Sequence, residues 1–174
     1  MFEIRRYTQR DAPQVGTLIA ISHSEFNLAE MPSQKRASML GPFAFSSSPV
    51  PEHQEAITAA ISAPSVWVAT AQREIVGVLR GGRTDHRDRT VLSSLFVSGR
   101  HHRQGIGRAL VKRFEEEYAD QAVKIFTLAA ALYAVPFYLS LGYKKSTGVR
   151  STSSFGEPGL PYQPMRKTVK RAAG

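Results

Sequence analysis

The sequence predicts one α/β domain over residues 1–174, with helices packed against a mixed sheet. The length fits one domain better than two. The composition, with 42% hydrophobic and 21% charged residues, is typical of a globular protein and excludes a fibrous or wholly disordered chain. Periodic segments follow one another in the order β-α-α-β-β-β-α-β-α-β-β, and this order predicts the α/β class.

The first two elements follow from short local patterns. Residues 2–7 alternate between apolar and charged side chains, as a half-buried strand does. A helix is expected next, because Asp11 can cap it, Pro13 is tolerated in its first turn, and Gln14 can reach back to the cap. Apolar residues then recur on one face of this helix from Val15 onward.

Residues 27–51 are expected to form a loop that folds over a pocket. Prolines and glycines interrupt this segment, yet it carries too much apolar surface for an idle linker. A second helix is expected over residues 51–61, closed by Pro64.

The middle of the chain predicts three strands. The apolar runs 66–69 and 75–79 predict a hairpin whose turn lies near Gln72 and Arg73. A charged loop is expected over residues 81–89, and the third strand over residues 91–97.

The last third is expected to hold a helix with one apolar face, a strand, a shorter helix and a hairpin. The strand is predicted over residues 124–129 and the shorter helix over 132–141, with Gly142 as its stop. Residues 143–149 and 163–169 are expected to pair around a loop rich in Ser, Gly and Pro. An exposed sheet edge is expected at residues 163–169, and such an edge would allow two copies of the chain to pair as a homodimer.

The positive charge is concentrated in one segment. The net charge is +9, and residues 80–113 hold nine Lys or Arg residues against two Asp. Such a field attracts polyanions, which include nucleic acid, an anionic membrane or a phosphorylated cofactor.

Several functional classes are excluded by what the sequence lacks. There is no Cys, which excludes disulfides, thiolate metal sites and thiol catalysis. His101 and His102 are adjacent, and no third ligand lies at a zinc-like spacing, so no metal site is expected. No apolar run reaches the roughly 18 residues of a membrane span, and the N-terminus lacks a secretory signal. A cytosolic, cytoplasmic protein is therefore expected.

The chemistry concentrates where the third strand passes into the following helix. The segment from Leu95 to Leu110 combines a strand, a cationic turn, and a helix start that holds Gly105 and Gly107. A helix N-terminus leaves its first N–H groups unpaired, and glycines keep side chains away from them, so this junction is built to hold phosphate. A P-loop is excluded because Arg108 follows Gly107, and a Rossmann fingerprint because Leu110 stands where its third glycine would be.

This chain resembles the GNAT N-acetyltransferase superfamily at two motifs. The first is His102-Arg103-Gln104-Gly105-Ile106-Gly107, which is similar to the acetyl-CoA motif Q/R-x-x-G-x-G/A. The second is the segment Ala134–Tyr143, which is similar to A-x-x-F/L-Y-x-x-x-G-F/Y. The resemblance covers residues 91–143 strongly and implies a mixed, mostly antiparallel sheet with a splayed strand pair and flanking helices.

The resemblance also implies how acetyl-CoA would be held. The N–H groups from Arg103 to Arg108 would hold the pyrophosphate, and the backbone at Phe96 and Val97 would pair with the pantetheine arm. The cofactor-binding set it implies is Phe96, Val97, His102, Arg103, Gln104, Gly105, Ile106, Gly107 and Arg108. Two positions depart from the family pattern, since His102 replaces Gln or Arg and Ala131 replaces an Asn common in the family.

The implied reaction is direct acetyl transfer from acetyl-CoA to a primary amine of a small molecule or peptide. The resemblance gives Tyr138 the role of proton donor to the departing thiolate. The base stays open among Glu25, Glu30, Asp85, His86 and a bound water, because Leu92-Ser93-Ser94-Leu95 holds neither carboxylate nor imidazole. Residues 27–51 and 150–161 are expected to wall the acceptor pocket, and the basic surface disfavours polyamines.

The sequence is also compatible with two other functions. The missing base is consistent with an acyl-CoA-binding module without catalysis. Nucleic-acid binding through the basic segment is disfavoured, because aromatic residues are not interleaved among its arginines to stack on bases.

Overall fold

A computed structural model describes residues 1–154 and 157–169, without the side chains of residues 85, 152–154, 157 and 158. The chain forms two compact units. The first unit holds Met1–Arg80 and Ser94–Phe114, and the second holds residues 81–93 and 115 onward. A single domain over residues 1–174 stays a prediction.

The strands of the described chain follow one hydrogen-bonded order, β1-β2-β3-β4-β5-β8-β6, with β7 paired to β8. Strands β4 and β5 are parallel, whereas β1 and β2, β5 and β8, and both β6 and β7 with β8 are antiparallel. The expected mixed, mostly antiparallel sheet with flanking helices is therefore confirmed. The strands are β1 (Glu3–Arg6), β2 (Ser65–Ala71), β3 (Glu74–His86), β4 (Arg89–Val97), β5 (Ile125–Ala131), β6 (Lys144–Lys145), β7 (Arg150–Ser154) and β8 (Glu157–Thr168).

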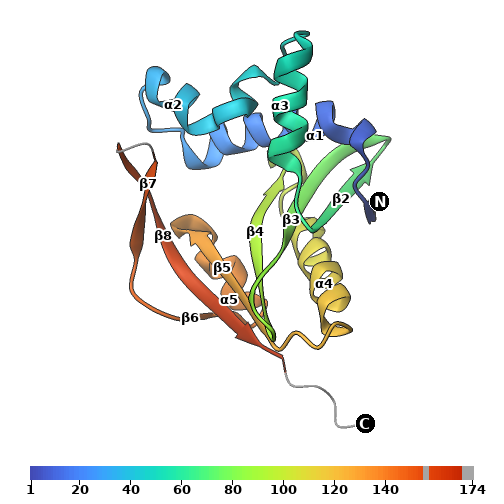
Figure 1. Cartoon of the computed structure of the whole chain (residues 1–174), viewed down its shortest axis with the longest axis vertical. Coiled ribbons are helices and arrows are strands. Elements are labelled where there is room, and N and C mark those ends of the chain that lie inside the picture. The colour runs from blue at the N-terminus through green and yellow to red at the C-terminus, as the bar shows by residue number, and fades with distance from the viewer. Residues whose placement is uncertain (155–156, 170–174) are drawn as a thin grey trace. The chain divides into compact units, whose positions relative to one another are not determined.

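In the first unit, α1 and α3 pack against each other at one end of strands β2 and β3 (Figure 1). Gly16 allows this close approach, because a Cβ built there would lie 2.8 Å from the Ile57 Cγ2 atom. The buried core beneath the two helices includes Val15, Ile19, Ile57, Ile61, Val68 and Val78. The helices of the chain are α1 (Ala12–Ser22), α2 (Ser33–Leu40), α3 (Pro51–Ile61), α4 (Ile106–Ala119) and α5 (Val135–Ser140), with short turns η1 (Gln9–Asp11), η2 (His23–Asn27), η3 (Gly41–Phe45), η4 (Gly99–His101) and η5 (Leu132–Ala134).

The expected cap of α1 is wrong in its details. The Asp11 side chain makes no capping bond to α1; its carboxylate accepts two 2.8 Å bonds from the Arg5 guanidinium and a 2.7 Å bond from the Thr8 N–H. Gln14 does not reach back either, since its Oε1 accepts the Ile75 N–H at 3.1 Å. Both side chains find their partners in β1 and β3, which local sequence patterns do not reveal.

Residues 27–51 are more ordered than the expected loop. They contain α2 and η3, which contact each other, and α3 follows with the predicted bounds. Helix α2 has no buried residue, so it lacks the apolar stripe by which sequence analysis finds a helix.

The hairpin of β2 and β3 is confirmed, and both turn residues adopt positive φ, 50° at Gln72 and 69° at Arg73. The charged loop expected over residues 81–89 is wrong, because β3 continues to His86 and β4 begins at Arg89. Extended strand pairing keeps these residues in the sheet in spite of their polarity and of the adjacent glycines 81 and 82.

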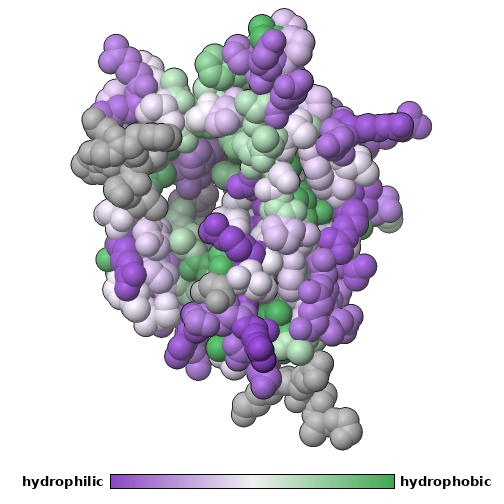
Figure 2. All heavy atoms as spheres, viewed as in Figure 1, coloured by the Kyte–Doolittle hydropathy of each residue, from purple (hydrophilic) through white to green (hydrophobic). Residues whose placement is uncertain are grey.

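Helix α4 is amphipathic, and its first half packs on the first unit. A Cβ at Gly77 of β3 would lie 2.9 Å from the Ile106 Cγ2 and 3.0 Å from the Leu110 Cδ1, so the helix rests directly on this glycine. Its outer side forms a hydrophilic band on the surface (Figure 2).

In the second unit, β5 and β8 run side by side from Ile125↔Thr168 to Ala131↔Tyr162 (Figure 1). Residues 143–149 were predicted to pair with residues 163–169, but β6 pairs with β8 only at Lys144↔Arg166 and Lys145↔Met165. The loop expected between them instead contributes β7 and the start of β8. Strand β8 pairs with β5 on one side and, at Met165 and Arg166, with β6 on the other, so residues 163–169 are not the fully open sheet edge that the sequence predicts. Within the described residues, every helix is too short or too polar to cross a bilayer.

Candidate functional site: a phosphate loop after β4

Strand β4 leads into residues 98–105, which we call the phosphate loop, and then into α4, whose second residue is Gly107. The parallel register of β4 with β5 runs from Arg89↔Ile125 to Leu92↔Leu128. At the far end of β4, the Ser98 N–H donates to the Val76 carbonyl of β3 at 2.9 Å. Neighbouring residues of a strand point their backbone groups to opposite sides, so the N–H and C=O of Val97 face away from β3. The backbone groups of Phe96 face β3.

The loop then reverses direction through two residues with positive φ. Arg103 has φ 64° and Gly105 has φ 83°, and α4 begins at Ile106. Turns of this kind group successive N–H groups into a concavity that binds anions. The first N–H groups of α4 also lack partners within the helix and carry its positive dipole end.

Open space lies in front of this backbone. A Cβ built on Gly105 would meet no atom within 4 Å. The side chains around it, Arg103, Gln104 and Arg108, are exposed, whereas Ile106 is buried beneath the helix and Gly107 is half-buried. This open, cationic, glycine-bearing backbone fits a diphosphate group.

His102 closes the loop onto the strand. Its Nε2 lies 2.9 Å from the Val97 carbonyl, and since a carbonyl only accepts, the imidazole donates. The Phe26 ring lies against the same imidazole, with 4.7 Å between ring centroids and 32° between ring planes. His102 therefore does not act as a free side chain at this motif position; it ties the loop to β4 and to η2.

The segment η2 supports the loop at a second point. A Cβ on Gly99 would lie 3.0 Å from the Phe26 Cζ and 3.4 Å from the Glu25 Oε2, so the loop fits against η2 only with glycine there. Sequence analysis missed Phe26, because nothing local connects η2 to a loop more than seventy residues later. Phe26 stands just before the expected loop of residues 27–51, and no local pattern singles it out.

The side chain of Phe96 is part of the core of the first unit. The ring packs against the cluster beneath α1 and α3 and makes an edge contact with His23, with 5.7 Å between ring centroids. Burial lowers the pKa of His23 below its ordinary value, which keeps this imidazole neutral at neutral pH.

Tyr138 lies in the second unit, on α5, and is 7% exposed. Its ring makes edge contacts with Phe137 and Tyr143, at centroid distances of 5.0 and 5.7 Å. Burial raises the pKa of Tyr138 well above its ordinary value, so the hydroxyl keeps its proton throughout the neutral range. Tyr143 donates to Glu115 at 2.9 Å, and Lys167 pairs with the same carboxylate at 2.7 Å.

The candidate bases lie on different elements of the structure. Glu25 lies in η2 with its carboxylate against Gly99, and Glu30 is exposed after η2. His86 is exposed at the end of β3 in the second unit, and the side chain of Asp85 lies outside the described residues. Ser94 of β4 accepts a 2.9 Å hydrogen bond from Arg80 Nε.

The chain belongs to the GNAT family. Residues 41–169 match the family model described as an acetyltransferase (GNAT) domain. The chain is 33% identical over 87 residues to N-acetyltransferase 8 of Homo sapiens, which covers 46% of this chain and 38% of that protein. It is 34% identical over 76 residues to the uncharacterized N-acetyltransferase YjcF of Bacillus subtilis (strain 168), covering 44% of this chain and 51% of that protein. The matches therefore span less than two thirds of either relative.

Solved structures share the fold. A GCN5-related N-acetyltransferase from Rhodopseudomonas palustris superposes with a TM-score of 0.74 at 19% identity, covering 96% of this chain and 95% of that chain. The PaiA N-acetyltransferase from Thermoplasma acidophilum, solved in complex with coenzyme A, gives 0.71 at 14% identity, covering 97% and 99%. At these identities the likeness concerns the fold alone.

Proposed function

We propose that this protein transfers the acetyl group of acetyl-CoA to a primary amine of a small molecule or peptide by direct attack. The observation that carries the proposal is the open backbone concavity at Arg103–Arg108. It combines two positive-φ residues, a helix N-terminus and unobstructed space in front of Gly105. Family membership supports acetyl transfer, and the concavity supports a donor that carries a diphosphate.

The binding roles follow from the backbone directions. The N–H groups from Arg103 to Arg108 hold the diphosphate, and the Arg103 and Arg108 side chains add positive charge. Val97, whose backbone groups face away from β3, is better placed than Phe96 to pair with the pantetheine arm. Its carbonyl already accepts from His102, so the Val97 N–H is the group that remains for this pairing.

Acetyl-CoA supplies an activated thioester. An N–C bond forms, the C–S bond breaks, the amine loses a proton and the thiolate gains one. Tyr138 keeps its proton because burial raises its pKa, so it serves as a hydrogen-bond donor to the developing thiolate. Full proton transfer from so weak an acid would be uphill. Glu25 is the base candidate that shares the first unit with the phosphate loop and contacts it.

Calorimetric titration of acetyl-CoA into the purified protein tests the proposal. Gly105→Ala is the diagnostic variant, because its Cβ would occupy the space in front of the concavity. Gly41→Ala is the matched control, since Gly41 also has positive φ (54°) and no atom within 4 Å of a built Cβ. Both variants should lose about 1 kcal/mol of stability from backbone strain, but only Gly105→Ala should lose affinity for acetyl-CoA.

Thiol release in the presence of small amines, amino acids and peptides then tests transfer. The proposal is wrong if the wild type gives no heat with millimolar acetyl-CoA. Binding without thiol release for any amine would instead support an acyl-CoA-binding module without catalysis.

A further inference from the structure

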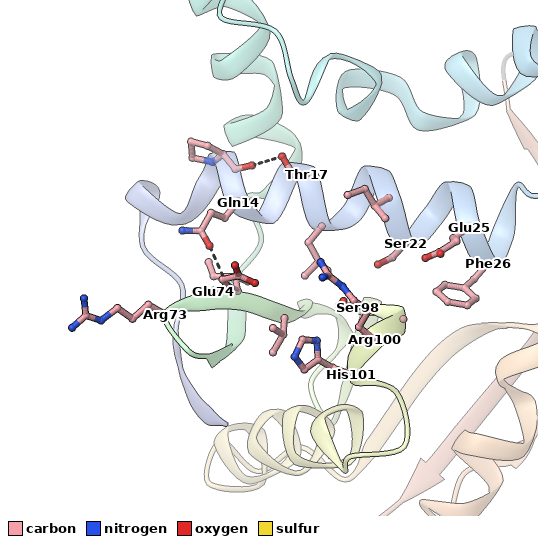
Figure 3. A pocket seen from close by; sticks show the side chains of 16 residues that line it. Gln14, Thr17, Ser22, Glu25, Phe26, Arg73, Glu74, Ser98, Arg100 and His101 are labelled. Carbon is pink, nitrogen blue, oxygen red and sulfur yellow. Dashed lines mark hydrogen bonds between the residues drawn. The ribbon is translucent and has the colours of Figure 1, made fainter. Parts of the chain in front are cut away.

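The first unit contains a cavity on the side of the phosphate loop that faces α1 (Figure 3). Its volume is about 880 Å³, and its walls are α1, the turn between β2 and β3, and residues 98–101. The wall contributed by the loop ends at His101, whereas the residues proposed to hold acetyl-CoA after the strand begin at His102. We call this space the α1 cavity.

Two buried polar atoms of the α1 cavity have no hydrogen-bond partner among the described residues. They are the Oγ of Ser22, a residue only 2% exposed, and the Nδ1 of His101. Ser22 comes from α1 and His101 from the opposite wall (Figure 3). Buried polar atoms are normally satisfied, so two orphans lining one cavity indicate that a polar ligand completes them.

Four charged side chains line the α1 cavity, Glu25, Arg73, Glu74 and Arg100, and none of them forms an ion pair within the described part of the chain. Glu25 and Glu74 lie toward the two ends of the cavity, and Arg100 stands on the loop between them (Figure 3). A cation flanked by carboxylates suits a ligand that carries both a carboxylate and an ammonium group. The volume exceeds that of a single amino acid and falls in the range of small-molecule sites.

We propose that the α1 cavity binds a small zwitterion of tripeptide size. The ligand carboxylate pairs with Arg100, its ammonium with Glu25 or Glu74, and its backbone amides satisfy Ser22 and His101. Because residues 98–101 form one wall of this cavity and continue into the phosphate loop, occupancy here stabilises the loop in one conformation. Glu25 lines this cavity and is also the base candidate of the proposed transfer, but binding of the zwitterion needs neither acetyl-CoA nor turnover, so the inference stands whether or not the chain acetylates an amine.

Calorimetry in the absence of acetyl-CoA tests the proposal with triglycine as the probe. N-acetyltriglycine lacks the ammonium and triglycine amide lacks the carboxylate, so each should bind at least about tenfold more weakly than triglycine. Equal affinity for all three probes, or no heat with millimolar triglycine, would overturn the proposal.

Two variants separate binding from folding. Ser22→Ala removes an unsatisfied hydroxyl, so it should leave the melting temperature unchanged or higher while weakening triglycine about fivefold, the loss of one hydrogen bond. Arg100→Gln should weaken triglycine about tenfold. Ser38→Ala, on the exposed α2 helix, is the control and should bind as the wild type does. Unchanged affinity in both cavity variants contradicts the assignment, as does a loss of folding in Ser22→Ala.

Discussion

The imidazole of His102 is held between two parts of the first unit: it donates to the Val97 carbonyl at 2.9 Å and packs on the Phe26 ring at 4.7 Å between centroids. One side chain thus connects the end of β4, the phosphate loop and η2. A rigid connection of this kind lowers the entropy lost when the loop closes on a ligand.

Phe26→Ala should therefore weaken acetyl-CoA binding about three- to tenfold, the energy of one aromatic pair. Phe26→Tyr keeps the ring and should bind acetyl-CoA as the wild type does. The measurement is calorimetric titration at constant salt. An unchanged dissociation constant for Phe26→Ala would show that the ring contact does not order the loop.

Arg103 occupies a backbone conformation that favours glycine. Its φ of 64° costs a residue with a side chain about 1 kcal/mol relative to the ordinary helical region. Arg103→Gly should raise the free energy of unfolding by about 0.5–1 kcal/mol, measured by urea denaturation. Arg103→Ala keeps the strained φ and should give no such gain. Both variants lose the charge, so both should bind acetyl-CoA more weakly and with a smaller salt dependence.

The phosphate loop could be predicted from the sequence because its signals are local. A strand, a turn that ends at Gly105, and an apolar helical face follow one another within residues 95–110, and the structure confirms each of these elements. The bounds of α3 were predictable for the same reason, since Pro51 starts that helix and Pro64 follows its end.

Elements that depend on distant partners could not be predicted. The side chains of Asp11 and Gln14 bond to Arg5 and to the Ile75 N–H rather than to α1. Strand β8 contains several prolines, which signal a loop, yet it is held between β5 on one side and β6 and β7 on the other. The α1 cavity and the contact between Phe26 and His102 could not be predicted either, because their residues are far apart in the sequence and meet only in the folded chain.

The Arg5–Asp11 pair should make stability depend on pH in the acid range. Hydrogen bonds from Arg5, with those from Thr8, lower the pKa of Asp11 below its ordinary 3.8. A lowered folded-state pKa contributes stability above the unfolded pKa, and this stability is lost as the pH falls through the folded pKa.

Asp11→Asn should therefore unfold more easily than the wild type by about 1 kcal/mol at pH 7. The difference should begin to shrink as the pH falls below about 4, where the carboxyl of the unfolded chain takes up a proton, and it should be lost as the pH falls through the lowered pKa of the folded state. Urea denaturation of both proteins at several pH values gives the comparison. A difference that stays constant down to pH 2 would assign the loss to packing rather than to charge.

Tyr138→Phe should lower kcat about a hundredfold and leave acetyl-CoA affinity nearly unchanged, because in the proposed reaction the hydroxyl acts on charge that develops only at the departing sulfur. Since burial raises the pKa of Tyr138, the hydroxyl stays protonated through the accessible pH range. The wild type should thus show no alkaline loss of kcat from this group up to about pH 9, and the variant should share the shape of its pH profile.

Tyr133→Phe, on a residue 59% exposed, is the control and should keep wild-type turnover. Steady-state kinetics with calorimetry on the same samples decides the matter, since a parallel loss of turnover and affinity in Tyr138→Phe would reassign Tyr138 to binding or packing.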